Sequence, residues 1–541
     1  MNMRTTFRLL IVCISLLSFT TQIYAQDLPK DWHLLDNTDD NYAGISLKKA
    51  YQLLKESGRK SSTVIVAVLD SGLDIDHEDI TSILWKNKKE KPGNGKDDDG
   101  NGYIDDVNGW NFIGGKDGSS LDAETLELTR LYRKYLKQFE GKNKFTITAN
   151  EQEDYQQYLK FKQLFTDGRD KLATAITRNQ EEFNFFDQMI PPLKTLVGKD
   201  MFSAEELKKA KIKTEQGKRL RASFFRIIDR NKEQGLTAEG LIEHYDELSG
   251  RMEELKKRLE FNYSLDFDGR AIIKDDVNNL TEKFYGNNDV TVRSEHGTHV
   301  SGIIAAVRNN NIGMDGIADN VLIMPVRTTP MGDELDKDVA NGIIYAVDNG
   351  AQIINMSFGK DFSPNKELVD KAVQYAKEKG VLLIHAAGND SKNTDYFYNF
   401  PTALMNDGSL ASNWIEVGAS APNAGKTLAA SFTNYGNYSV DIFAPGVDIY
   451  ATLPGSKYGR RDGTSMASPV VSGVAALVLS YFPELTPEQL KEILIESGTV
   501  YTTPVSEPGS DRLVPFGALS KTGKVINAHK AIELALKKYG K

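Results

Sequence analysis

Three short segments of the chain carry residue types that together can cleave an acyl bond. Asp70 opens the sequence Asp-Ser-Gly after an apolar run, His296 opens His-Gly-Thr-His, and Ser465 lies within Gly-Thr-Ser-Met-Ala-Ser-Pro. Each segment alone also fits a plain structural role, as a turn, a structural histidine or a helix cap. In combination they supply a nucleophilic hydroxyl, a base that activates it and an acid that orients the base. We therefore predict a Ser-His-Asp acyl-enzyme mechanism.

The sequence around these residues resembles the subtilases, the subtilisin-like serine proteases of peptidase family S8. The resemblance rests on the stretches VAVLDSGLDIDHED, HGTHVSGIIAA, INMSFG, AAGN and FAPGVDIYATLPGSKYGRRDGTSMASPVVSGVAAL. It covers about residues 41–111 and 292–535 and leaves out the middle of the chain. It implies an exported serine endopeptidase, a hydrolase of polypeptide substrates, with Asp70, His296 and Ser465 as its catalytic triad.

The resemblance also implies roles for residues near the triad. Asn389, in AAGN, would donate to the oxyanion that forms on the attacked carbonyl, although a turn asparagine is the alternative. Ser465 opens a helix, whose dipole favours the same negative charge. The residues expected to pair with an extended substrate and to line its first pocket are Ser357, Phe358 and Gly359. The opposite wall is expected near Phe400-Pro401, and His299 is expected to face the interior.

Other chemistries fit the residues less well. A zincin needs His-Glu-x-x-His, but Glu295 precedes the histidine pair instead of lying inside it. An α/β-hydrolase elbow needs Gly-x-Ser-x-Gly, and Ala467 stands in the place of the second glycine. A catalytically idle peptide-binding or assembly protein on the same fold stays open as the alternative. Such a protein has no need to keep the triad and Asn389 together.

The sequence offers two candidate sites for structural calcium. Residues 97–108 place side-chain oxygens as in an EF-hand loop, but Asn108 replaces the final glutamate, and a solvated Asp/Gly-rich turn is the competing interpretation. The predicted ligands of this loop are Asp97, Asp99, Asn101 and Asp105. The second site follows from the resemblance alone, which pairs Asp79 with the loop 308–314 and makes Asn310 its side-chain ligand.

The sequence pattern predicts that the elements that position these residues form an α/β fold. Continuous apolar runs of strand length are typical of parallel strands that are buried on both faces. They cover Ser62–Asp70, Val321–Val326, Gln352–Met356 and Val381–Ala387. Helical patterns over 338–349 and 366–379 alternate with these runs. We predict a doubly wound, mainly parallel sheet of subtilisin type, with its site beyond the carboxyl ends of the strands.

Residues 121–262 interrupt this pattern with charged, helix-forming sequence. Apolar residues spaced alternately by four and three predict a coiled-coil-like seam; they are Leu241, Tyr245, Leu248, Met252, Leu255 and Leu259. We therefore expect a long inserted helical subdomain between residues 26–120 and 263–541, which form the two parts of the subtilase domain. The sequence leaves three roles open for the insertion, which are a gate for substrates, a surface that recruits a partner and a neutral surface decoration.

Composition limits the remaining possibilities. The chain has 541 residues, of which 40% are hydrophobic and 26% charged, as expected for a globular protein. A net charge of −9 without a basic block argues against nucleic-acid binding. Residues 1–25 have the basic start and short apolar stretch of a signal peptide, so we expect export to the periplasm or cell exterior and no transmembrane segment. Cleavage there removes Cys13, the one cysteine, so the mature chain forms no disulfide. A lipid anchor at Cys13 is the less favoured alternative, because Val12 is bulkier than lipobox sequences normally allow. The stretch from Gln26 to Asp70 is too short for a separate inhibitory prodomain, and we expect none.

Overall fold

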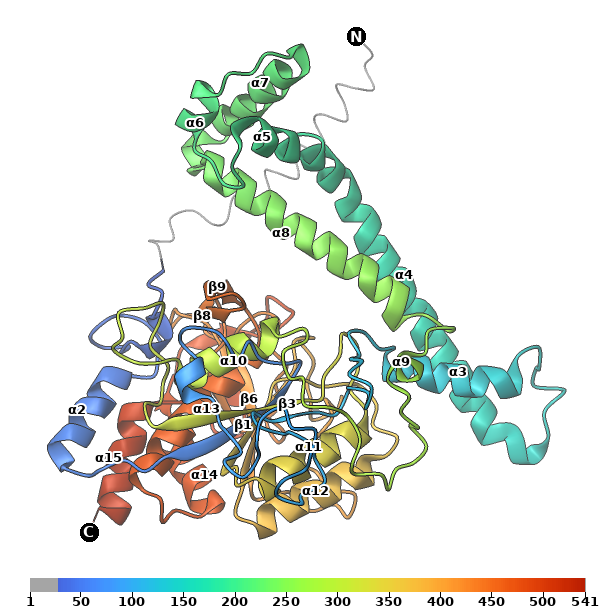
Figure 1. Ribbon diagram of the computed structural model, residues 1–541, viewed down its shortest axis with the longest axis vertical. Coiled ribbons are helices and arrows are strands. Elements are labelled where there is room, and N and C mark those ends of the chain that lie inside the picture. The colour runs from blue at the N-terminus through green and yellow to red at the C-terminus, as the bar shows by residue number, and fades with distance from the viewer. Residues whose placement is uncertain (1–27, 541) are drawn as a thin grey trace. The chain divides into compact units, whose positions relative to one another are not determined.

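The computed structural model describes residues 28–540, so the predicted signal peptide lies outside the described residues. The chain forms two compact units, which appear in Figure 1 as a mixed α/β body and a group of helices. We call residues 29–130 and 266–541 the sheet unit, and residues 131–265 the helical unit. Residues 121–130 belong to the sheet unit, because Leu121 is buried there against Ile113 and Ile273.

A nine-stranded sheet forms the centre of the sheet unit, in the strand order β10-β13-β7-β6-β5-β4-β1-β3-β2. The strands are β1 (Val64–Asp70), β2 (Trp110–Asn111), β3 (Val321–Arg327), β4 (Ile353–Met356), β5 (Leu382–Ala386), β6 (Trp414–Ser420), β7 (Ile442–Pro445), β10 (Thr499–Val500) and β13 (Lys524–Val525). All neighbours pair in parallel except β10 and β13 at one edge, which are antiparallel. The prediction of a mainly parallel sheet is therefore confirmed.

Helices cover both faces of this sheet, as a doubly wound fold requires. Ala67 and Leu69 of β1 share a core with α11 (Asp336–Asp348) and α12 (Lys366–Glu378). Val66 and Val68 alternate with them along the strand and are also buried, so they face the other layer. That layer contains α10 (Glu295–Ala305) and α13 (Thr464–Tyr481), which pack on each other and on β1. The strands therefore carry continuous apolar sequence because neither face meets solvent.

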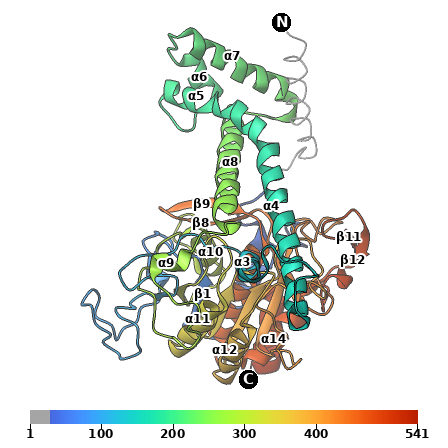
Figure 2. The same ribbon diagram turned by 90° about the vertical axis from the view of Figure 1, so that its right-hand side faces the viewer.

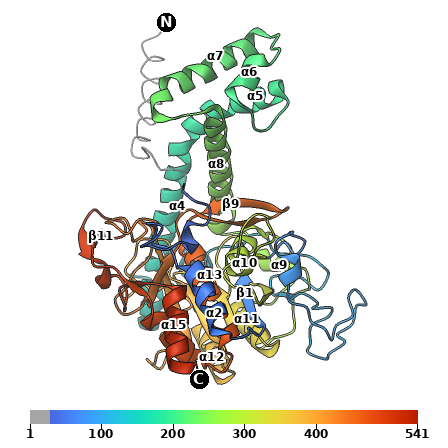
Figure 3. The same ribbon diagram turned by 90° about the vertical axis from the view of Figure 1, so that its left-hand side faces the viewer.

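The remaining helices of the sheet unit are α2 (Leu47–Ser57), α9 (Gly269–Ile273), α14 (Pro487–Glu496) and α15 (Ala528–Tyr539). Figure 3 shows α2 beside α15, which pack together. Two hairpins lie outside the main sheet: β8 (Ile449–Leu453) with β9 (Lys457–Arg461), and β11 (Pro504–Ser506) with β12 (Leu513–Pro515). Within the described chain, α13 is the one helix long and apolar enough to cross a membrane, and 89% of that stretch is buried in the fold. Its apolar sequence is thus explained by its place in the core.

The helical unit contains α4 (Gln152–Asp187), α5 (Ile190–Val197), α6 (Ala204–Lys209), α7 (Glu215–Arg230) and α8 (Ala238–Lys257). The helix α3 (Glu127–Phe139) begins in the sheet unit and continues into the helical unit. Figure 2 shows α4 and α8 side by side, and the predicted seam residues Leu241, Tyr245, Leu248 and Met252 are buried. The prediction of a long helical insertion is confirmed, although Leu259 lies beyond the end of α8 in a short π-helical stretch (Arg258–Asn262).

Candidate active site

The end of β1 and the start of α10 bring Asp70 and His296 together. Nδ1 of His296 lies 2.8 Å from Oδ1 and 3.0 Å from Oδ2 of Asp70. The helix approaches the strand this closely because residue 297 is glycine, where a Cβ atom would lie 2.1 Å from the carbonyl oxygen of Gly72. A carboxylate accepts the proton on Nδ1, so Nε2 of the imidazole is left as the basic nitrogen.

The electrostatics of this pair favour a protonated imidazole. Burial alone lowers the pKa of His296, but the Asp70 carboxylate outweighs burial and holds that pKa above its usual value of 6.5. Asp70 is 3% exposed, and its Oδ1 also accepts a hydrogen bond from the main-chain N–H of Ser71 (2.7 Å). The carboxylate is thus held in place while the side chain of His296 stays 40% exposed.

His299 lies one turn further along α10 and has a different environment. It is 1% exposed, and its Nε2 lies 3.1 Å from the carbonyl oxygen of Gly459. Burial lowers the pKa of His299 to about 3, so this side chain stays neutral at physiological pH. The expectation that His299 faces the interior agrees with this position.

Ser465 occupies the first turn of α13, at the carboxyl end of the sheet. Its hydroxyl donates to the main-chain carbonyl of Ser357 (3.1 Å), and the Ser357 hydroxyl donates in turn to the carbonyl of Ser465 (3.0 Å). Because Ser357 directly follows β4, this pair of hydrogen bonds fixes the start of α13 against the end of that strand. The main-chain N–H of Ser465 lies in the first turn, where helical N–H groups have no partner within the helix.

Asn389 follows β5 and is oriented by the residue before Ser465. Its Oδ1 accepts hydrogen bonds from the main-chain N–H (2.8 Å) and the hydroxyl (3.0 Å) of Thr464. The main-chain donor requires the oxygen at this position, so the amide nitrogen must point the other way. That nitrogen lies 3.7 Å from the point where a Cβ atom on Gly463 would be, and Asn389 itself is exposed. The oxygen of this exposed side chain is therefore fixed at Thr464, and its amide donor lies near Gly463.

The segment Ser357–Gly359 continues from β4 along the same edge of the sheet. Lys360, the next residue, exchanges two main-chain hydrogen bonds with Phe400, of 3.0 and 2.8 Å. The predicted first pocket and the predicted opposite wall are therefore joined at one end by a short antiparallel bridge.

An acidic cluster lies in the loop that was predicted to bind calcium. Carboxylate oxygens of Glu90, Asp97 and Asp99 all lie within 4.8 Å of one another. Oε2 of Glu90 is buried and has no hydrogen-bond partner among the described residues. An uncompensated buried carboxylate oxygen beside two other carboxylates suits a hard divalent cation with oxygen ligands. The residues present thus fit calcium.

The other two residues predicted for this loop have different partners. Asp105 accepts hydrogen bonds from the main-chain N–H groups of Asn94 (3.2 Å) and Gly95 (2.7 Å). Oδ1 of Asn101 accepts from the main-chain N–H of Tyr103 (2.8 Å). These side-chain contacts close the loop, and the main-chain N–H of Asn101 donates to Oδ1 of Asp97 (3.2 Å) and of Asp99 (3.1 Å) in the acidic cluster.

The residues of the second predicted calcium site also meet. Asp79 is fully buried, and its Oδ1 accepts a hydrogen bond of 2.5 Å from Nδ2 of Asn310. Its Oδ2 accepts from the hydroxyl of Tyr458 (2.9 Å). The amide oxygen of Asn310 accepts from the main-chain N–H of Ile312 (2.9 Å), so it faces away from Asp79. In this arrangement two neutral donors satisfy the carboxylate, and the fit to a cation is poorer than at Glu90.

Arg327 and Glu90 belong to these sites but were not predicted from the sequence. Arg327 pairs in register with Asp70, is fully buried, and donates to the carbonyl groups of Ser71 (2.8 Å) and Val292 (3.1 Å). It therefore ties the strand that ends at Asp70 to the segment that leads to His296. A single arginine at the end of the apolar run VLIMPVR is a signal that could have indicated Arg327. Glu90 lies outside the EF-like spacing of residues 97–108, so that pattern did not indicate it.

Comparison with known proteins identifies the family. The model of the Subtilase family matches residues 61–517. The chain belongs to the Subtilase family. This match spans the helical unit as well as the motifs that were recognised in the sequence.

Two curated subtilases and one solved structure illustrate the similarity. A thermophilic serine proteinase of Bacillus sp. (strain AK1) is 42% identical over 188 residues, which are 35% of this chain and 43% of the relative. Thermitase of Thermoactinomyces vulgaris is 41% identical over 186 residues, or 34% of this chain and 61% of thermitase. A crystal structure of a cold adapted subtilisin-like serine proteinase is 30% identical and covers 45% of this chain and 78% of its own, with a TM-score of 0.37. The chain thus spans about half the length of the curated relatives it matches.

Proposed function

We propose that the chain is an exported serine endopeptidase that hydrolyses polypeptides through an acyl-enzyme. The hydrogen-bonded pair of Asp70 and His296, at the sheet edge where Ser465 opens a helix, is the observation that supports this most directly. Membership of the Subtilase family and the names of the serine proteinases among its relatives support the same reaction class. Export is proposed on the composition of residues 1–25.

The nucleophile needs a base, and His296 is placed to serve as one. With Asp70 holding the proton on Nδ1, Nε2 accepts the proton of the Ser465 hydroxyl as its oxygen attacks the peptide carbonyl. The imidazolium then gives this proton to the leaving amine, and an acyl-enzyme remains. Water then attacks the ester carbonyl while His296 takes one of its protons. As the bond from the acyl carbon to the Ser465 oxygen breaks, His296 returns that proton to the Ser465 oxygen, and the product leaves as a carboxylic acid.

The contact between Ser465 and Ser357 links substrate binding to this activation. The carbonyl of Ser357 is an acceptor of the kind that an N–H group of an extended peptide needs. A peptide that donates to this carbonyl replaces the hydroxyl of Ser465, whose proton is then free to turn toward His296. In this proposal substrate pairing itself releases the nucleophile.

Negative charge on the attacked oxygen is stabilised by groups that are already oriented. The amide nitrogen of Asn389 is directed by the two hydrogen bonds from Thr464, so it needs no reorganisation when the charge forms. The main-chain N–H of Ser465 and the positive end of the α13 dipole add to the same region.

Structural calcium is proposed at the cluster of Glu90, Asp97 and Asp99. The ion would balance the three carboxylates and the buried oxygen of Glu90, and it would hold the loop in its folded form. The site of Asp79 and Asn310 stays a prediction from resemblance, because neutral donors already face that carboxylate.

A fluorophosphonate probe tests the proposed mechanism against the idle-binding alternative. Such a reagent forms a stable bond only with an activated serine, and peptide mapping locates the modified residue. We expect one modification at Ser465, none in Ser465→Ala, and a parallel loss of hydrolysis of an unfolded protein substrate. A folded chain that is not labelled, or one labelled at another serine, contradicts the assignment.

A further inference from the structure

His385 is a buried histidine with partners on both ring nitrogens, and neither the triad nor the oxyanion site uses it. It lies within β5, between Ile384 and Ala386, and is fully buried. Its Nε2 lies 2.8 Å from the carbonyl oxygen of Phe358, and its Nδ1 lies 2.9 and 3.1 Å from the carboxylate oxygens of Glu416. A carbonyl oxygen only accepts, so Nε2 carries a proton and donates it to Phe358.

This hydrogen bond holds the side of the segment Ser357–Gly359 that faces away from Ser465. The carbonyl of Ser357 points to the hydroxyl of Ser465, whereas the carbonyl of Phe358 points to His385. Successive carbonyl groups of extended chain point in opposite directions, which agrees with this alternation. The carbonyl of Ser357 is therefore directed toward Ser465. The next carbonyl along the chain, that of Phe358, points the other way and is held by the imidazole of His385.

The strand ladder does not provide this support. The strand β4 ends at Met356, and the register places Met356 opposite His385 in β5. The three residues beyond β4 lie past the last paired position, so side chains must fix them. Gly359 packs on Asn399, since a Cβ atom there would lie 2.3 Å from Oδ1 of Asn399.

Glu416 holds the imidazole ring in the orientation that reaches Phe358. It faces His385 in the register of β5 and β6, and Oε2 also accepts from Nε1 of Trp414 (2.8 Å). The main-chain N–H of Glu416 donates to Oδ2 of Asp441 (2.9 Å), and Asp441 is paired in turn with Lys521 (2.9 Å). The ring therefore has a fixed acceptor on one nitrogen, which sets the direction of the other.

We propose that His385 is a positioning residue for substrate recognition, acting through its hydrogen bond to the carbonyl of Phe358. The inference rests on the proposed function of Ser357–Gly359 as the segment that pairs with the peptide. By fixing that segment, His385 keeps the carbonyl of Ser357 where the N–H of a bound peptide can reach it. It contacts neither the peptide nor the reacting atoms, so its loss weakens peptide binding and spares the reaction of Ser465 with a small reagent.

Two substitutions separate this role from general support of the core. In His385→Gln the side-chain amide reaches as far as Nε2 and can still donate to Phe358. In His385→Asn the amide reaches only as far as Nδ1, so it keeps Glu416 and loses Phe358. We would measure kcat and KM of the full chain for a chromogenic peptide, together with the rate of fluorophosphonate labelling of Ser465.

We expect His385→Asn to raise KM about tenfold, since one lost hydrogen bond is equivalent to about 1.4 kcal/mol. The kcat value and the labelling rate should stay within about threefold of wild type, and His385→Gln should restore KM to within about threefold. Equal KM values for the two variants, or a fall in labelling that matches the fall in peptide hydrolysis, would overturn the proposal.

If neither variant folds, Glu416→Leu provides an independent test, because it removes the acceptor that orients the ring and leaves His385 in place. A raised KM with unchanged labelling supports the positioning role, and an unchanged KM refutes it. Wild-type protein that hydrolyses nothing and is not labelled at Ser465 would instead refute the proposed function, on which this inference depends.

Discussion

The two units of the molecule bury different kinds of side chain. The core of the helical unit consists of aromatic and aliphatic residues such as Phe186, Leu193 and Phe224. Ion pairs between described residues of this unit have partly or largely exposed side chains. An example is Lys194 with Asp246, 2.7 Å apart, whose side chains are 17% and 47% exposed. Apolar packing of this kind favours compactness without demanding one arrangement of each group.

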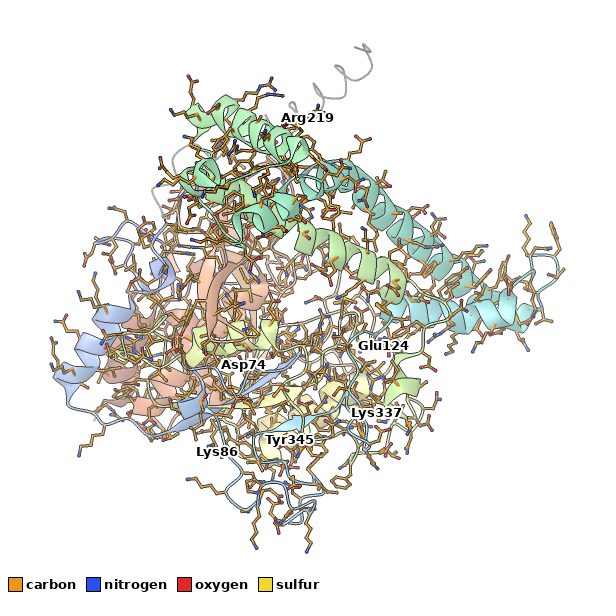
Figure 4. All side chains as sticks on the ribbon, turned by 45° about the horizontal axis from the view of Figure 1, so that its top comes forward. Asp74, Lys86, Glu124, Arg219, Lys337 and Tyr345 are labelled. Atoms are coloured by element: carbon orange, nitrogen blue, oxygen red, sulfur yellow. The ribbon has the colours of Figure 1, made fainter. Side chains whose placement is uncertain are left out.

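The sheet unit carries charged groups inside. Lys360, whose side chain is 1% exposed, lies 3.0 Å from Glu127 and 2.9 Å from Asp336. A second group joins Lys337 to Asp275 (2.6 Å), and Figure 4 labels Lys337 on its ribbon. A buried charge needs its partner at one distance and direction, so such groups fix the positions of the segments that carry them. The unit that contains Asp70, His296 and Ser465 thus also contains these buried ion pairs.

The largest expected effect follows from the loss of the contact between Asp70 and His296. Asp70→Asn should lower kcat about 10,000-fold, because the amide no longer holds the imidazole as the tautomer with Nε2 free. The acid limb of kcat/KM should also move. In the proposed mechanism His296 acts as a base only when neutral, so we expect wild-type activity to fall as pH drops through the pKa of His296, which Asp70 holds above 6.5.

Without the carboxylate that pKa falls, and the acid limb of Asp70→Asn should therefore lie at lower pH than the wild-type limb. The measurement is the pH dependence of kcat/KM for a peptide substrate. An acid limb that stays in place would show that another group governs it.

The contrast between the units can be tested directly with two lysines. Lys360→Met leaves the carboxylate of Asp336 buried without its cation and leaves Glu127 with Arg130 alone (2.7 Å), which should destabilise the sheet unit by about 3–5 kcal/mol. Lys194→Met breaks an exposed pair and should cost about 0–1 kcal/mol. Urea unfolding would be followed by fluorophosphonate labelling, which reports the sheet unit, and by circular dichroism, which reports the helices of both units. Equal losses of unfolding free energy in Lys360→Met and Lys194→Met would contradict the difference between the two units.

Calcium should stabilise the sheet unit by a smaller amount. An ion that binds only the folded state at 100 times its Kd adds about 2.7 kcal/mol. Melting in excess calcium and in chelator should therefore differ for wild type and should coincide for Glu90→Gln. Asp98→Asn is the matched control, because Asp98 belongs to the same loop but lies outside the cluster of Glu90, Asp97 and Asp99. A difference that persists in Glu90→Gln would place the ion elsewhere.

The strands and the triad candidates could be predicted because their signals are local. The run that ends at Asp70 and the motif around Ser465 each carry their information within about a dozen residues, so the fold and the sheet edge follow from the pattern. His385 and Glu416 could not be paired in this way. They lie on neighbouring strands, and only the register of β5 and β6 places them side by side.

Glu90 was missed for a related reason. It precedes the EF-like spacing, and it reaches Asp97 and Asp99 because the loop folds back to hydrogen-bond Oε1 of Glu90 through the main-chain N–H of Asp98 (2.9 Å) and of Asp99 (3.2 Å). Tyr345, labelled in Figure 4, adds a long-range contact by donating to Asp106 (2.8 Å). Contacts that depend on tertiary folding have no characteristic residue spacing in the sequence, so a sequence pattern does not predict them.

The smallest expected effect on the chemistry comes from removing the helical unit. Replacing residues 131–265 with a Gly/Ser linker should leave the labelling rate of Ser465 within about threefold of wild type. The reason is that the side chains that hold Asp70, His296 and Ser465 all belong to the sheet unit, while the helical unit has an apolar core of its own. The ratio of kcat/KM for a folded protein to that for a short peptide would be measured in the same preparations. A changed ratio with unchanged labelling would assign the helical unit to substrate access, and an unchanged ratio would exclude a gate. Labelling that falls more than tenfold, or a chain that no longer folds, would show that the sheet unit depends on its insertion and that the two kinds of core are not independent.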